Sequence, residues 1–331
     1  MTQGLGVNNV VLSQVTEFVP GLWSNEVVAS YKSNIVMAQL VRRLNHRGKK
    51  GNSITIPNPL RGNASAKVAG TQVNLIPGDG QAGINITISK QYEYSRLIED
   101  IVSVQALGSL RQFYTDDGGY AIAKQIDKDL INVAAANGSA GTTGSTEVAL
   151  DASGNISAAL ANAYIGDMSA NFDQATANAT DLSDVGIRRI VRALDKQDAP
   201  MRGRHLVVTP NVKADLIGQP RFTEQAFTGE KNGNNTIRNG LVGNVYAMDV
   251  YVTNQLFEVD NAAGTATVGE VLLAFQSDAL LLIEQAGVRT QRQYKQEWLA
   301  DLFTADVIYG VGVTRPSSII PVVVPLDFTD G

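Results

Sequence analysis

The sequence predicts an α+β fold with more than one compact part, and three observations carry that prediction. Isoleucines alternate with polar residues near positions 54 and 84, which is typical of short strands. Apolar residues recur at helical spacing through residues 97–137, and period-two alternation returns over residues 288–324. With 331 residues, the chain also exceeds the size at which one hydrophobic core usually stops growing.

Composition restricts the classes of function. The chain is 44% hydrophobic and 18% charged, which favours folded cores, and its net charge of -5 disfavours sequence-independent nucleic-acid binding. It has no cysteine, so disulfides and thiolate metal ligands are excluded, and His46 and His205 are its only imidazoles. Residues 1–10 lack a signal-peptide pattern and no apolar stretch approaches a membrane span. We therefore expect synthesis in the cytosol and no membrane partner.

The first 45 residues predict an arm followed by a helix. Residues 1–25 are polar and rich in Gly and Asn around Trp23, which indicates an extended segment that needs a neighbour to hold it. From Trp23 to Leu44, apolar residues fall at roughly helical spacing.

Residues 46–95 predict a long two-stranded excursion. Ile54 and Ile56 mark one strand, and Ile84, Ile86 and Ile88 mark a second with its isoleucines on one face. The Gly-, Asn- and Pro-rich stretch between them is too long for a structureless loop inside a compact domain. We therefore expect the excursion to project, with its apolar face covered by sister copies. The subunit-interface candidates are Trp23 of the preceding arm and, in this region, Ile54, Ile56, Ile84, Ile86 and Ile88.

Residues 96–180 predict a long helix and a connector. The helical pattern over residues 97–137 would span ~60 Å, and Gly118 and Gly119 predict a kink or break that serves as a hinge. Asn137 and Gly138 end it. The stretch 138–180 is low in complexity and reads as a connector or poorly packed loop, with a short helix over Ile156–Tyr164.

Residues 181–287 predict a small α/β domain. Ser183 caps a helix closed by Pro200, a strand covers His205–Val208, and Thr209 with Pro210 begins a short helix ending at Gly218. Strands follow within 240–254 and 270–275. Residues 288–331 then supply long strands over 288–298, 307–313 and 319–324, which we expect to pack against the long helix.

No catalytic constellation emerges from the motifs. Gly78–Gly83 spells G-x-G-x-x-G, but it precedes a strand rather than a helix, so a turn is favoured over a nucleotide loop. Asp127 and Asp129 do not share a helix face, so solvated charges or subunit contacts are favoured over a carboxylate pair. His205 reads as a β-edge histidine. We expect no catalytic residue, no cofactor and no metal.

A basic helix face follows Ser183, made by Arg188, Arg189 and Arg192. Arginines opposite an apolar stripe usually form the solvated side of a helix. We favour ion pairs at a subunit interface over nucleic-acid contact, and add these three residues to the interface candidates.

The order of these parts resembles the major capsid proteins of tailed bacteriophages, whose fold is named for the Hong Kong 97 phage. Local similarities to the coat proteins of short-tailed phages lie, in order, at Trp23, Gly51–Pro57, Tyr120–Asp127, Ala193–Asp195, Ala199–Pro200, Gly203–Pro210, Asn239–Gly240 with Gly243, and Val250–Tyr251. The likeness covers roughly residues 15–325, and the order of the pieces carries it.

The resemblance implies an N-terminal arm and helix (1–45), an extended loop (46–95), a peripheral domain with a spine helix (96–180), an axial domain (181–287) and peripheral C-terminal strands (288–331). It implies hexamers and pentamers that tile an icosahedral shell around double-stranded DNA, assembled in the bacterial cytoplasm. Implied partners are sister copies, a portal, scaffolding and possible decoration proteins, with no sequence-specific DNA contact.

Three other functions stay open on the sequence alone. An encapsulin-type compartment shell shares the fold and would hold enzymes. A nucleotide-binding oxidoreductase would use Gly78–Gly83, and a tail or fibre protein would form tubes or trimers.

Overall fold

The computed structural model describes residues 9–10, 36–57, 64, 66–70, 72–73, 83–100, 110–139, 143–158, 160, 162–219 and 243–326. Trp23, the helix expected over residues 23–35 and the glycine motif apart from Gly83 lie outside these residues.

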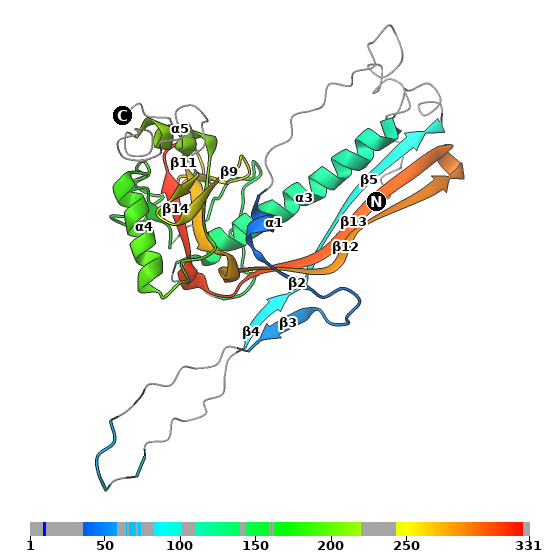
Figure 1. The fold of residues 1–331 in the computed structure, drawn as a ribbon. Helices are drawn as coiled ribbons and strands as arrows, with labels where there is room; N and C mark the ends of the chain where they lie inside the picture. The colour runs from blue at the N-terminus through cyan, green and yellow to red at the C-terminus, as the bar shows by residue number, and fades with distance from the viewer. Residues whose placement is uncertain are drawn as a thin grey trace, which may run out of the picture.

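A long five-stranded sheet forms one half of the molecule, with strand order β1-β5-β13-β12-β2. Its strands are β1 (Asn9–Val10), β2 (Arg42–Asn45), β5 (Lys90–Glu99), β12 (Leu280–Lys295) and β13 (Ala300–Val313). β12 and β13 form an antiparallel ladder from the Leu280–Val313 pair to the Lys295–Ala300 pair. Helix α3 (Leu110–Asn137) lies along this sheet (Figure 1), so the prediction that the C-terminal strands pack against the long helix is confirmed.

A seven-stranded sheet forms the other half, with order β6-β14-β11-β7-β9-β8 and β10 paired to β11. Its strands are β6 (Tyr164–Ile165), β7 (Arg204–Val208), β8 (Asn244–Val245), β9 (Met248–Val252), β10 (Glu258–Asp260), β11 (Thr267–Gln276) and β14 (Ile319–Val324). Helices α4 (Asp184–Lys196) and α5 (Pro210–Gly218) cover one face through a buried cluster that includes Ile187, Leu194 and Val212.

The predicted helix caps of this half are confirmed. The Ser183 hydroxyl accepts a hydrogen bond from the Gly186 amide, and the Thr209 hydroxyl accepts one from the Val212 amide, with Pro210 at the first helical position. His205 is not a β-edge residue, because β7 pairs with β11 on one side and β9 on the other. Burial of the imidazole lowers the pKa of His205, although the Asp249 carboxylate acts in the opposite direction.

Three predictions about the long helix and about the helix expected before it are wrong. The helix begins at Leu110 and not at residue 97, because residues 97–99 pair with β13 as part of β5. It runs unbroken through Gly118 and Gly119, where a kink was expected. Before it, the described helix α1 covers only Met37–Leu40, and Leu44 pairs with Ile283 in a parallel ladder. In each case sheet pairing or packing overrides a local pattern.

The low-complexity stretch 138–180 is not a poorly packed loop. Ile156 and Phe172 are buried in the main core, and the residues described between 156 and 164 form no helix. Short polar side chains build its turns: the Asp151 carboxylate accepts hydrogen bonds from the backbone amides of Ser153 and Asn155. The polar composition of this stretch therefore comes from side chains that form hydrogen bonds in turns, and does not indicate poor packing.

Asp127 joins α3 to α1, which has no cap from its own N-cap side chain. The Asp127 carboxylate is fully buried and accepts hydrogen bonds from the amides of Val36 (2.7 Å), Met37 (3.1 Å) and Ala38 (2.9 Å). Burial raises the pKa of Asp127, while these three amides lower it. Asp127 is therefore not a solvated charge, as the sequence suggested, but a cap supplied from a distant helix.

Replacing Asp127 with Ala should lower the free energy of unfolding by about 3 kcal/mol, because it leaves buried amides without an acceptor. Urea denaturation of the unassembled subunit measures this. Lys124→Ala, at a partly exposed position of the same helix, should change stability by less than about 0.5 kcal/mol. Equal losses in the two variants would contradict the capping role.

Candidate assembly site

The two-stranded excursion is anchored to its own chain. Strand β3 (Ser53–Ile56) pairs with β4 (Ile84–Thr87), as predicted. Ile86 and Ile88 are buried against Leu281 and Ile283 of β12, and Ile54, Ile56 and Ile84 are half-buried around them. The subunit's own long sheet therefore covers Ile86 and Ile88, while an interface role for the partly exposed Ile54, Ile56 and Ile84 stays a prediction.

Two glycines of β13 allow this close contact. A Cβ at Gly312 would lie 2.8 Å from the Ile86 side chain, and one at Gly310 would lie 2.6 Å from the Thr87 backbone oxygen. Larger residues would push β4 away from the sheet. The base of the excursion is consequently fixed to the body.

The far end of the excursion is not covered by the described residues. Val68 and Val73 are 68% and 56% exposed, and these residues lie far from both sheets (Figure 1). Val68 and Val73 therefore present apolar side chains to solvent at this end.

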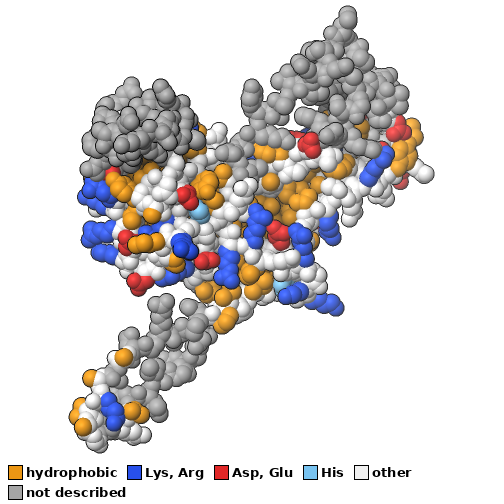
Figure 2. All heavy atoms as spheres, in the orientation of Figure 1, with side chains coloured by type: hydrophobic (Ala, Val, Ile, Leu, Met, Phe, Trp, Pro, Cys, Tyr) orange, Lys and Arg blue, Asp and Glu red, His pale blue; other side chains and the backbone are white. Residues whose placement is uncertain are grey.

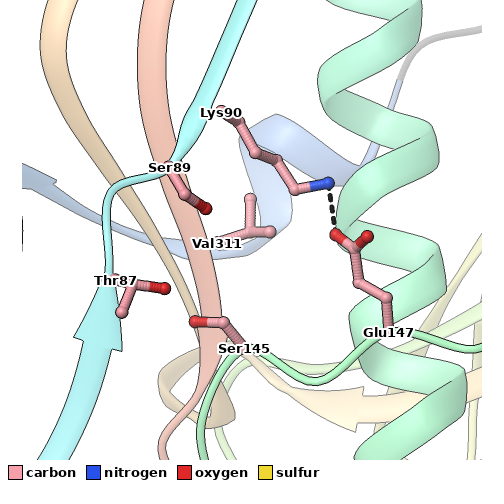
Figure 3. Close-up of a pocket in the computed structure, with 6 residues that line it drawn as sticks. All are labelled: Thr87, Ser89, Lys90, Ser145, Glu147 and Val311. Atoms are coloured by element: carbon pink, nitrogen blue, oxygen red, sulfur yellow. Dashed lines mark ion pairs between the residues drawn. The ribbon is translucent and has the colours of Figure 1, made fainter.

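A polar pocket lies where the excursion joins the body, with a volume of about 340 Å³ (Figure 3). Thr87, Ser89, Lys90, Ser145 and Glu147 line it together with Val311. The strands β4 and β5, the strand β13 and the segment 143–147 meet here, so the pocket marks the junction of the excursion, the long sheet and the chain that follows α3.

Lys90 is the centre of an ion-pair network at this junction. Its ammonium lies 3.0 Å from the Asp129 carboxylate of α3 and pairs also with Glu147. Asp129 further accepts a hydrogen bond of 2.6 Å from the Tyr309 hydroxyl of β13. Asp129 is thus a buried partner, not a solvated charge.

The pKa shifts follow from this geometry. Burial lowers the pKa of Lys90, but the hydrogen bonds to Glu147 and Asp129 outweigh it and the net shift is upward. Burial and the Asp129 carboxylate raise the pKa of Tyr309. The pKa shifts favour a charged Lys90 and a protonated Tyr309, and the network joins β5, α3, β13 and the segment after α3 as a structural clamp.

Replacing Lys90 with Met should lower the free energy of unfolding by about 3 kcal/mol, since it leaves the buried Asp129 carboxylate without its cation. The double variant Lys90→Met with Asp129→Asn should recover part of that loss. Glu147→Gln is the matched control: this side chain is 37% exposed, so the change should cost less than about 1 kcal/mol. Chemical denaturation measures the free energy of unfolding of these variants and of Asp129→Asn alone. A double variant that loses as much stability as Lys90→Met and Asp129→Asn lose together would contradict the clamp.

The two hinge candidates have different surroundings in α3. The Tyr94 ring of β5 lies against Gly118, where a Cβ would come within 2.8 Å of it, whereas no atom lies within 4 Å of a Cβ at Gly119. The Tyr94 hydroxyl donates a hydrogen bond of 2.9 Å to Asp117. Gly118 is therefore a contact point between helix and sheet.

Gly118→Ala should lower the free energy of unfolding by about 1–3 kcal/mol because of the clash with Tyr94. Gly119→Ala should raise it by about 1 kcal/mol because Ala is the better helix former and the site is open. Thermal unfolding of the two variants tests the contrast. Stabilisation by both changes would show that Tyr94 does not lie on Gly118.

The basic face of α4 is partly neutralised within the chain. Arg188 pairs with Asp184 one turn earlier (2.8 Å), and Arg189 donates to the Asp167 carbonyl (2.7 Å). Arg192 is exposed and has no carboxylate partner among the described residues. Arg188 thus has a carboxylate partner within its own chain, and a subunit-interface role for the three arginines stays a prediction.

Sequence reasoning missed Lys90, Glu147 and Tyr309 as members of a site. They belong to three separate segments, and only folding brings them to Asp129. In the described ranges, no group of three or more His, Asp or Glu residues is placed to hold a metal ion. Within the same ranges, no helix has the length and apolar character needed to cross a bilayer.

Comparison with known proteins agrees with this architecture. No curated protein matches the sequence significantly. The chain has the fold of a Mycobacterium phage Che8 chain (23% identity, TM-score 0.67, 92% of this chain and 97% of that one covered). It is similar also to a chain from the capsid of cyanophage P-SCSP1u (18% identity, TM-score 0.67, 95% of each chain covered). A chain from the capsid of Ralstonia phage GP4 is similar as well (16% identity, TM-score 0.63, 94% of this chain and 97% of that one covered).

These likenesses show the Hong Kong 97 phage-type fold. The phage capsid protein family matches residues 86–322, which is most of the chain and includes α3, β12 and β13. The chain therefore belongs to the phage capsid protein family and is a subunit of the virion shell.

Proposed function

We propose that this subunit is the major component of an icosahedral head, assembled as hexamers and pentamers around double-stranded DNA. The observation that supports this best is the excursion: its base is fixed to β12 and β13, while its tip carries exposed Val68 and Val73. An anchored base with exposed apolar residues at the far end suits a contact with the next copy. Repeated head-to-tail contacts of this kind close into rings.

We propose that the chain divides into an arm (1–45), an extended loop (46–95), a peripheral domain (96–180 and 288–331) and an axial domain (181–287). The five-stranded sheet with α3 supports the peripheral assignment, and the seven-stranded sheet with α4 and α5 supports the axial one. β14 returns from the C-terminal segment to the seven-stranded sheet through β11. Two chain segments therefore connect the two sheets, one from β11 to β12 and one from β13 to β14.

We infer no enzymatic activity, no cofactor and no metal for the subunit. The charged groups of the clamp at Lys90 are held in pairs, and the histidine that sequence analysis considered, His205, is buried in the centre of a sheet. The match over residues 86–322 favours a capsid over a cellular compartment, an oxidoreductase or a tail fibre. Gly83 immediately precedes β4, so the end of the glycine motif leads into a strand.

A portal, scaffolding protein and decoration protein are further proposed partners of the shell. DNA would be enclosed without specific contacts, and a net charge of -5 supports this because few fixed cations mean weak phosphate adhesion. The role of Gly118 and Gly119 in bending α3 during expansion of the shell stays a prediction, as does an interface role for Trp23.

Deleting residues 58–82 tests the proposal. The deletion leaves Pro57 and Gly83 as a two-residue connection between Ile56 and Ile84, which already pair, so the packing of β3 and β4 on β12 is kept. We expect a folded subunit by circular dichroism that forms no closed shells by negative-stain microscopy. As a control, Val68→Ser with Val73→Ser keeps the loop length and should weaken assembly without abolishing folding. Normal particles from the deletion variant would refute the role of the excursion.

A further inference from the structure

Two short links between the two sheets are hydrogen-bonded to each other and form one joint. The first link is the 3-10 turn η4 (Ser277–Ala279) between β11 and β12, and the second is the segment 314–318 between β13 and β14 (Figure 1). The Thr314 amide donates a hydrogen bond of 2.9 Å to the Ala279 carbonyl. The Thr314 hydroxyl donates one of 2.6 Å to the Asp278 carbonyl. A change in η4 therefore reaches both links at once.

His205 of β7 and the turn before it hold the first residue of this joint. The imidazole Nε2 of His205 lies 2.9 Å from the Ser277 hydroxyl oxygen. The Ser277 amide donates a hydrogen bond of 2.9 Å to the Gly203 carbonyl. Gly203 has a φ of +70°, and a Cβ there would lie 3.0 Å from the Ser277 hydroxyl oxygen. Only glycine therefore allows the turn to approach Ser277 without strain.

The hydrogen bonds around Ser277 fit a neutral imidazole. A hydroxyl has one proton, and that of Ser277 is donated to the Gly203 carbonyl at 3.2 Å. The Ser277 oxygen therefore accepts its other hydrogen bond from the Nε2–H of His205. A neutral imidazole with its proton on Nε2 has none on Nδ1. Nδ1 is buried and has no hydrogen-bond partner in the described residues, so one proton-accepting atom is unused.

The surroundings of the ring are mostly apolar. The His205 side chain is 9% exposed, and Figure 2 shows that histidine takes up very little of the visible surface. The Tyr251 ring meets it edge to face at a centroid distance of 5.6 Å, and the Phe275 ring does so at 5.7 Å. Burying a charge among such groups is costly unless a partner compensates it.

One carboxylate lies near the ring. Asp249 is the residue opposite on β9, and its carboxylate lies 4.0 Å from Nδ1 and is 52% exposed. The Arg204 guanidinium, next along β7, is bonded to Asp195, and the Asp278 carboxylate is bonded to Gln276. Burial lowers the pKa of the imidazole more than the Asp249 carboxylate raises it.

We propose that His205 is a proton-sensitive latch on the joint between the two sheets. The neutral imidazole holds Ser277, and an imidazole protonated on Nδ1 turns toward the Asp249 carboxylate and releases Ser277. A shift of the ring is needed because 4.0 Å is too long for a hydrogen bond from Nδ1 to Asp249. The proton comes from solvent, and no covalent bond other than N–H forms. The latch belongs to the single subunit and does not depend on the arrangement of the shell.

Acid weakens the latch, and the sign follows from linkage. The pKa of His205 is lower in the latched protein than the ordinary value of 6.5, so the latched form binds fewer protons than the released or unfolded form. The contribution of the latch is therefore complete above the ordinary value and is lost as the pH falls below it. Because one proton is involved, the equilibrium changes by at most about tenfold per pH unit.

Hydrogen–deuterium exchange of backbone amides in the unassembled subunit tests the latch. His46→Gln leaves His205 as the single imidazole, and His46→Gln with His205→Gln keeps an Nε2 donor for Ser277 but cannot titrate. At about pH 5, the amides of residues 277–279 should exchange about three- to tenfold faster in the first variant than in the second. At about pH 7.5, the difference should be less than about twofold. The two variants are compared at the same pH, so their intrinsic exchange rates are equal.

The amides of α4 are the internal reference, because this helix does not contact Ser277 through any hydrogen bond among the described residues. Their exchange should be the same in the two variants at each pH. Faster exchange of α4 and of residues 277–279 together at low pH would indicate general loss of the fold and would overturn the latch. Equal exchange of residues 277–279 in the two variants at about pH 5 would overturn it as well.

Nuclear magnetic resonance of the imidazole gives a test that does not depend on replacing His205. In His46→Gln, the single histidine signal should titrate below the ordinary value of 6.5. Adding Asp249→Asn, at a half-exposed position, should lower the pKa of His205 further because it removes the nearby negative charge. Titration at or above 6.5, or no change with Asp249→Asn, would overturn the proposed roles of burial and of Asp249.

Discussion

The contact of α3 with the long sheet is the constraint on which the other features depend. Lys90 of β5, Asp129 of α3 and Tyr309 of β13 meet in one buried network, and Glu147 closes it from the segment after the helix. A buried carboxylate is tolerated only where charge and hydrogen bonds compensate its loss of water. The network therefore fixes which turn of α3 faces the sheet. Asp127 lies two residues earlier on the same helix, and its carboxylate accepts hydrogen bonds from the backbone amides at the start of α1.

This fixed helix and sheet hold the base of the excursion. β4 continues after Ser89 into β5, so the strand at the base is joined to the strand that carries Lys90. Gly310 and Gly312 let β4 lie close on β13, and Ile86 and Ile88 fill the space against β12. The base is therefore buried against the same sheet that holds α3.

The two sheets have different partners. The long sheet packs along α3, and its strands β12 and β13 pair from end to end with two register shifts. The seven-stranded sheet is covered by α4 and α5, and a groove along α4 is lined by Arg189, Arg192 and Lys196. His205 is buried in the centre of this sheet. Two chain segments connect the halves, from β11 to β12 and from β13 to β14.

Features that depend on local chemistry could be predicted from the amino-acid sequence. The strands at Ile54 and Ile86, the caps at Ser183 and Thr209 and the end of the long helix at Asn137 each follow from neighbouring residues. Patterns of two and 3.6 residues, and side chains that bond nearby amides, act over short distances, which is why a sequence reports them. The order of the elements was enough to indicate the family.

The residues that contact each charged or apolar surface are known only from the tertiary fold. Asp127 and Asp129 look like solvated helix charges until Val36 and Lys90 are brought to them from distant segments. The isoleucine face of β4 looks like an interface until β12 covers it. Gly118 looks like a helix breaker until the Tyr94 ring occupies the place of its missing side chain. Burial and pairing of these groups depend on residues far away in the chain, so no local pattern can report them.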